Sequence, residues 1–148
     1  MTYAVALYDV VKALHIMAVV GAFGLPLAYP LLLPYVQRNH PEALAGVHDV
    51  QLWLNRRVTG TGTALILVFG VYLATKADLW SEVWVTVPLI ILVIIGGVGG
   101  AIINPSVARL SQTAGTPEYE AEYARYIRFE ILLGALVLIA IFFMAAKP

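Results

Sequence analysis

The chain has 148 residues, of which 61% are hydrophobic and only 12% are charged, and its nine basic and nine acidic side chains cancel. Soluble domains carry about a quarter charged residues, so this composition predicts a protein that is surrounded by lipid. Zero net charge excludes the basic excess that nucleic-acid binding requires, and the lack of cysteine excludes disulfides, iron–sulfur clusters and thiol catalysis.

Four apolar segments are each close to the ~20 residues that a helix needs to cross a ~30 Å hydrocarbon core. They cover about residues 10–35, 58–74, 83–103 and 129–146. Backbone polar groups in lipid must be satisfied within each segment. We therefore expect an all-α fold, a transmembrane four-helix up-down bundle that forms one domain over residues 1–148.

The distribution of basic residues predicts how this bundle is oriented. The connections before the second and fourth spans hold Arg38, Arg56, Arg57, Arg109, Arg125 and Arg128, and the connection over 75–82 holds only Lys76. By the positive-inside rule, the two arginine-rich connections face the cytoplasm and both termini lie on the outer side.

The first span carries the ionisable residues Lys12 and His15. Such side chains are costly in lipid, so each is a functional hypothesis, although Lys12 lies near enough to the boundary to extend into the headgroups. His15 lies deeper. It is either a neutral core histidine with a hydrogen bond inside the bundle, or an axial ligand to haem or a ligand to a metal, because neutral imidazole suits iron in an apolar bundle.

A second axial ligand for a haem b is hard to find in the chain. His40 and His48 fall in the predicted cytoplasmic loop, at the wrong depth. Met144 lies near the outer end of the fourth span, at a depth that matches His15. His15 and Met144 are therefore the candidate cofactor-binding residues, and the other ways to complete the site are five-coordinate iron or a second His15 from a symmetry mate.

The third span contains closely spaced glycines, including a GxxxG motif at Gly96 and Gly100. This motif lets another helix approach closely. The partner is either a helix of the same bundle or the same face of a second copy, which would make a homodimer or a contact in a larger membrane complex.

A polar helix leads into the fourth span. Tyr119, Tyr123, Tyr126 and Glu130 fall on one stripe of this helix at helical spacing. We expect Glu130 to form an ion pair at the cytoplasmic end with Arg56, Arg57 or Arg128, and so to dock the second and fourth spans against each other.

Several stretches resemble a known family. VVKALHIMAVVGAFG, LNRRVTGTGTALILVFGVYLA, INPSVARL and the closing FFMAAKP look like the bacterial integral membrane family catalogued as domain of unknown function 2269. The resemblance covers essentially the whole chain and implies a multi-pass protein of the bacterial cytoplasmic (inner) membrane.

The pattern is more loosely similar to the CopD copper-resistance membrane domain and to HemJ-type protoporphyrinogen oxidases. In the HemJ family a first-helix histidine is implicated in haem binding, and that role corresponds to His15 here. A lysine of the third helix is also important in that family, whereas the third span of this chain has no lysine. That departure argues against protoporphyrinogen oxidation.

Three functions remain open at this stage. The first is a haem- or metal-associated redox or haem-handling protein with His15 as ligand. The second is a non-catalytic accessory or assembly subunit that uses the glycine face, the tyrosine stripe and the arginine–Glu130 contact. The third is a copper or proton transporter that works as an oligomer, which is the least favoured because a single imidazole and no midplane carboxylate make a poor relay.

Overall fold

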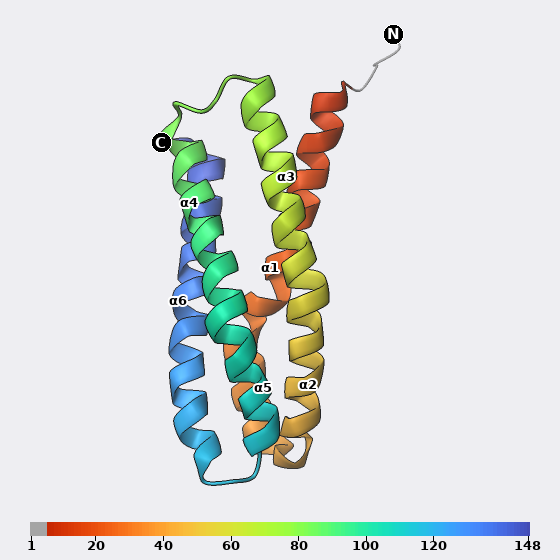
Figure 1. Cartoon of the computed structure of the whole chain (residues 1–148), viewed down its shortest axis with the longest axis vertical. Helices are drawn as coiled ribbons and strands as arrows, with labels where there is room; N and C mark the ends of the chain where they lie inside the picture. The colour runs from red at the N-terminus through yellow and green to blue at the C-terminus, as the bar shows by residue number, and fades with distance from the viewer. Residues whose placement is uncertain (1–5) are drawn as a thin grey trace.

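The computed structural model describes residues 6–148, and within that range the chain is helical apart from short connections (Figure 1). The α-helices are α1 (Leu7–Asn39), α2 (Leu44–Leu54), α3 (Gly60–Lys76), α4 (Val83–Val98), α5 (Asn104–Thr113) and α6 (Glu118–Ala146). A 3-10 turn η1 (Pro41–Ala43) precedes α2, and the π-helical turns η2 (Asn55–Thr59) and η3 (Gly99–Ile103) join α2 to α3 and α4 to α5.

These elements combine into four continuous helices that are long and apolar enough to cross a membrane. They run over Leu7–Asn39, Pro41–Lys76, Val83–Thr113 and Glu118–Ala146. The predicted all-α four-helix membrane fold is therefore confirmed. The start of α1 and the C-terminus lie at the same end of the bundle (Figure 1). Which side of the membrane that end faces stays a prediction.

The four helices are longer than a bilayer is thick. At 1.5 Å per residue, helices of 29 to 36 residues reach about 44 to 54 Å, which exceeds a hydrocarbon core of about 30 Å. The extra length belongs to the segments that we expected to be cytoplasmic loops. That expectation was wrong for His48 in particular, because it lies on α2 and is fully buried.

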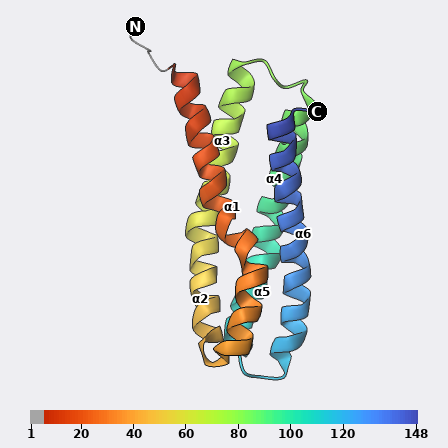
Figure 2. The same ribbon diagram turned by 180° about the vertical axis from the view of Figure 1, so that it is seen from behind.

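The helices associate in pairs. α1 packs most extensively on α3, α4 packs on α6, and at the opposite end α2 packs on α5. Figure 2 shows that α1 changes direction near its middle, where Pro26 and Pro30 lie within the helix. A proline removes a backbone hydrogen bond and bends the helix. The bend lets the two halves of α1 pack against different neighbours.

The closest helix crossing joins α1 to α3. A Cβ added to Gly62 would lie 2.7 Å from the Cβ of Ala22 and 3.3 Å from its Cα, so only glycine fits there. The Thr59 hydroxyl donates to the carbonyl oxygen of Ala22 at 3.1 Å, at the same crossing. Small residues and a hydroxyl thus bring these two backbones together, as is usual between helices in lipid.

Candidate functional site

A cavity of about 340 Å³ lies between the four long helices. It lies at the level where α3 begins and α4 ends. All four helices line it. The lining residues are Phe23, Pro26 and Leu27 from α1; Asn55, Arg56, Thr59, Gly60 and Thr63 from η2 and α3; Ile95, Gly96, Gly99, Gly100, Ile103 and Asn104 from α4, η3 and the start of α5; and Glu130, Leu133, Gly134 and Val137 from α6. Its lining is amphiphilic. The side chains of Asn55, Arg56, Asn104 and Glu130 lie toward one end, and aliphatic side chains such as Leu133 and Val137 lie toward the other.

The sequence creates this space with glycines and irregular helix turns. Gly96, Gly99 and Gly100 line the cavity from one side, and Gly60 and Gly134 line it from others. The two π-helical turns, η2 and η3, both border the cavity. Such turns widen a helix locally and occur mostly as single turns at functional sites.

The glycines of α4 do not pack against a helix of the same chain. A Cβ added at Gly97, Gly99 or Gly100 would meet nothing within 4 Å, and one added at Gly96 would meet only the Thr63 methyl group at 3.9 Å. The interpretation of Gly96 and Gly100 as a close-packing face within the bundle is therefore wrong. Their use in a homodimer stays a prediction.

The cavity opens to the surface between α3 and α4. Its mouth consists of Arg56, Gly60, Gly96 and Gly100, all of which are exposed. α3 and α4 also contact each other less than α1 contacts α3. At the expected depth of the spans, this mouth faces lipid close to one membrane interface.

Glu130 is the buried charged residue of the cavity, with only 6% of its surface exposed. It lines the cavity together with Arg56, but the two do not form an ion pair. Among residues 6–148 the ion pairs are Lys12–Asp9, His40–Glu42 and Arg109–Glu122. The expected pairing of Glu130 with Arg56, Arg57 or Arg128 is therefore not formed, and Glu130 is left without a cation.

A chain of buried hydrogen bonds joins α2 to α6 and ends at Tyr126, one turn before Glu130. The Tyr119 hydroxyl lies 2.8 Å from Nε2 of His48, and Nδ1 of His48 lies 2.9 Å from Oε1 of Gln51. Nε2 of Gln51 donates to the Tyr126 hydroxyl at 2.6 Å, and Glu130 follows one turn further along α6. The tyrosine stripe therefore faces the bundle interior, and the idea that it is a surface for assembly was wrong.

This chain could not be found from the sequence, because His48 and Gln51 lie in a segment that we expected to be a loop. Their spacing of three residues, on a polar stretch with hydrophobic neighbours, is the one signal that they share a helix face. Buried polar groups need partners, and each of these side chains finds one on another element or one turn away.

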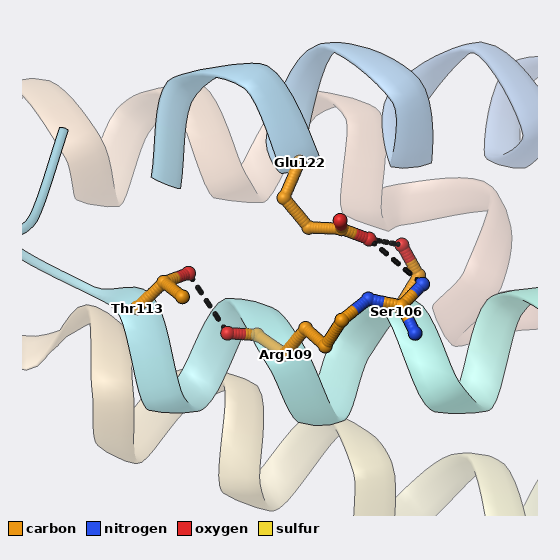
Figure 3. A network of polar contacts seen from close by, with 4 residues as sticks. All are labelled: Ser106, Arg109, Thr113 and Glu122. Carbon is orange, nitrogen blue, oxygen red and sulfur yellow. Dashed lines mark hydrogen bonds and ion pairs between the residues drawn. The ribbon is translucent and has the colours of Figure 1, made fainter. Parts of the chain in front are cut away.

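A second polar cluster fixes α5 against α6 (Figure 3). The Ser106 hydroxyl donates to the Glu122 carboxylate, which also accepts from Nη2 of Arg109 at 3.1 Å. Ser106 is buried, whereas the Arg109 side chain is 44% exposed. This cluster joins α5 to α6 and helps to hold this end of the bundle together.

His15 lies at the interface of α1 and α3. Its Cε1 is 3.2 Å, and its Nδ1 3.7 Å, from the position of a Cβ on Gly70, so the ring fills the notch that this glycine leaves. Nδ1 is buried and has no hydrogen-bond partner. His15 does not line the cavity, nor does Met144.

His15 and Met144 belong to different helix pairs at their end of the bundle, α1 with α3 and α6 with α4. A haem at His15 would require α1 and α3 to separate at Gly70, so the surroundings of His15 do not fit a haem in this conformation. Within the described residues, no three His, Asp or Glu side chains gather where they would hold a metal ion.

Comparison with known proteins adds a family and nothing further. The model of a family described as "Predicted integral membrane protein (DUF2269)" matches residues 9–148. No curated protein and no solved structure matches the chain. The description of the family gives a location in the membrane and no reaction.

Proposed function

Because the chain belongs to the family of predicted integral membrane proteins of unknown function 2269, whose description names no reaction, we propose from its own geometry that it binds a lipid-like amphiphile in the cavity between its four helices. One observation carries this proposal: the cavity is amphiphilic and opens between α3 and α4, where a molecule dissolved in the bilayer would enter. Ligand sites in membrane bundles commonly lie where irregular backbone lines a cavity.

The polar and apolar parts of the lining match the two parts of an amphiphile. Asn55, Asn104 and Glu130 offer hydrogen bonds to a polar head, and Leu133 and Val137 offer an apolar surface to a hydrocarbon tail. Binding sites for small molecules are typically apolar with a few placed polar groups. The proposal makes the protein a lipid-binding or lipid-handling component of the bacterial inner membrane.

Filling the cavity tests the proposal. Gly100→Leu adds a side chain at a glycine that lines the mouth of the cavity, whereas the matched control Gly97→Leu adds one at a glycine that does not line it; a Cβ added at either position meets no atom within 4 Å. Each protein is purified in a mild detergent, and the bound small molecules are extracted and quantified by mass spectrometry. We expect about one amphiphile per chain in the wild type and in Gly97→Leu, and a large loss in Gly100→Leu. Equal amounts in all three proteins would refute the proposal.

Haem ligation by His15 is a second candidate, for a conformation in which α1 and α3 have separated at Gly70. One observation favours it: the buried Nδ1 atom of His15 has no hydrogen-bond partner among the described residues. An absorption spectrum of the purified protein, oxidised and then reduced with dithionite, tests this candidate beside a His15→Ala variant. A Soret band near one haem per chain that disappears in the variant would establish His15 as a ligand. A colourless, folded protein would leave His15 as a packing residue at Gly70.

A further inference from the structure

We infer that the ligand of the cavity is an ammonium-bearing zwitterionic phospholipid of the ethanolamine type, with its ammonium group on Glu130 and its phosphate on Arg56. This inference rests on the proposed function and adds the chemistry of the headgroup. Three features carry it: the direction of the hydrogen-bond chain, the uncompensated carboxylate, and the arginine at the mouth of the cavity.

The hydrogen-bond chain has one direction. An amide oxygen only accepts and an amide nitrogen only donates, so the two bonds of Gln51 fix the roles of its neighbours. His48 donates from Nδ1 to Gln51 and accepts at Nε2 from the Tyr119 hydroxyl. The Tyr126 hydroxyl accepts from Gln51, so its own proton is free for another acceptor, and Glu130 follows one turn later on the same helix.

Glu130, one helix turn from Tyr126 on α6, is therefore placed to accept the proton at the end of this chain. A carboxylate offers about four lone-pair sites, and the single proton of the Tyr126 hydroxyl can occupy only one of them. Glu130 also lines the cavity and has no cationic partner within residues 6–148. A buried carboxylate without a cation is unfavourable, and a primary ammonium group would supply both a charge and three donors.

Arg56 supplies the complementary charge at the mouth. Its side chain is exposed, lines the cavity and forms no ion pair among the described residues. Guanidinium groups bind phosphate through paired hydrogen bonds. A headgroup that enters ammonium first would place its phosphate nearer the mouth, where Arg56 lies, while the acyl chains stay in the lipid between α3 and α4.

Native mass spectrometry with defined lipids tests this assignment. The probes are phosphatidylethanolamine and phosphatidylglycerol with the same acyl chains, added to the delipidated protein in detergent. Both carry the phosphate, and only the first carries an ammonium group. We expect the wild type and the control Glu120→Gln, whose side chain is exposed and outside the cavity, to retain phosphatidylethanolamine about tenfold over phosphatidylglycerol.

In Glu130→Gln the two lipids should be retained about equally, and Glu130→Asp should restore part of the preference. Arg56→Gln should lower the retention of both lipids. The ¹⁵N spectrum of His48 in each variant shows whether the donor chain is intact, since the wild-type direction requires the Nδ1-protonated tautomer. A wild-type His48 with its proton on Nε2 would overturn the direction of the chain and with it the inference.

Two further outcomes separate this inference from the proposed function. Equal retention of both lipids by the wild type, with loss of both in Gly100→Leu, would overturn the ammonium assignment and leave lipid binding in the cavity intact. Retention that is unaffected by Gly100→Leu would overturn both.

Discussion

Replacing Gly62 with alanine should separate α1 from α3. The new Cβ would lie 2.7 Å from the Cβ of Ala22, about 1 Å inside the ordinary contact distance of ~3.8 Å between carbon atoms. Its neighbours there are a backbone atom and a Cβ fixed to it, and neither can rotate away. The helices must move apart, and overpacking of this kind costs about 1 to 3 kcal/mol.

The helix propensity of alanine offsets part of this cost. Alanine is favoured over glycine in a helix by about 1 kcal/mol, so the net loss in Gly62→Ala should be about 1 kcal/mol. Gly97 is a matched control on α4, because a Cβ added there meets nothing within 4 Å. Gly97→Ala should keep the propensity gain alone. The two variants should therefore differ by about 2 kcal/mol, or about 30-fold in the unfolding equilibrium constant.

Titration with sodium dodecyl sulfate in mixed micelles, followed by circular dichroism, measures these free energies of unfolding. Combining Gly62→Ala with Ala22→Gly removes the atom that clashes, so the double variant should recover most of the clash energy although a second helix glycine is added. Equal stability of Gly62→Ala and Gly97→Ala would show that α1 and α3 do not cross as closely as described.

Three further predictions concern the polar end and the orientation of the bundle. Tyr126→Phe leaves the buried amide donor of Gln51 unpaired and should lower the free energy of unfolding by about 1 to 3 kcal/mol. Tyr123→Phe should change this free energy little, because the Tyr123 hydroxyl has no partner among the described residues. Equal losses in the same titration would contradict the hydrogen-bond chain. Arg109→Met removes a partly exposed ion pair and should cost less than about 1 kcal/mol, with a difference from the wild type that shrinks in high salt; a loss of several kcal/mol that salt does not alter would contradict this. The chain has no cysteine, so a membrane-impermeant maleimide should label Ser81→Cys from outside intact cells and Gln112→Cys only after lysis; the reverse pattern would invert the predicted orientation.

The sequence was sufficient to predict the four membrane helices, because lipid imposes a continuous apolar stretch on each span and leaves no alternative for the backbone. It was not sufficient to predict where those helices end. The polar residues around His48 and Gln51 read as a loop, since their partners Tyr119 and Tyr126 lie about 70 residues away and only the tertiary structure brings them together.

Glycine spacing was misleading for a related reason. Gly96 and Gly100 match the GxxxG motif, yet among the described residues an added Cβ would meet only the Thr63 methyl group, at 3.9 Å from Gly96, and nothing within 4 Å of Gly100. The close crossing uses Gly62, which faces Ala22. Gly62 and the next glycine of α3, Gly70, are too far apart in the sequence to form a GxxxG motif. A small-residue pattern shows where a helix can be approached, but whether a neighbour is present depends on the geometry of the whole bundle.

Glu130 was expected at the membrane edge with an arginine partner, because arginines are frequent nearby in the sequence. The structure instead turns its side chain into the bundle, where Arg56 shares the cavity without pairing to it. Position along the chain predicts depth in the membrane, whereas the direction of a side chain depends on which face of α6 is buried.

Photocrosslinking tests whether lipid reaches the cavity between α3 and α4. A phospholipid with a diazirine near its headgroup is incorporated into proteoliposomes and activated, and the modified peptides are mapped by mass spectrometry. Modification should concentrate on residues 55–63 and 95–104 and fall sharply in Gly100→Leu but not in Gly97→Leu. Modification spread over the outward faces of all four helices, and unchanged in Gly100→Leu, would contradict this prediction.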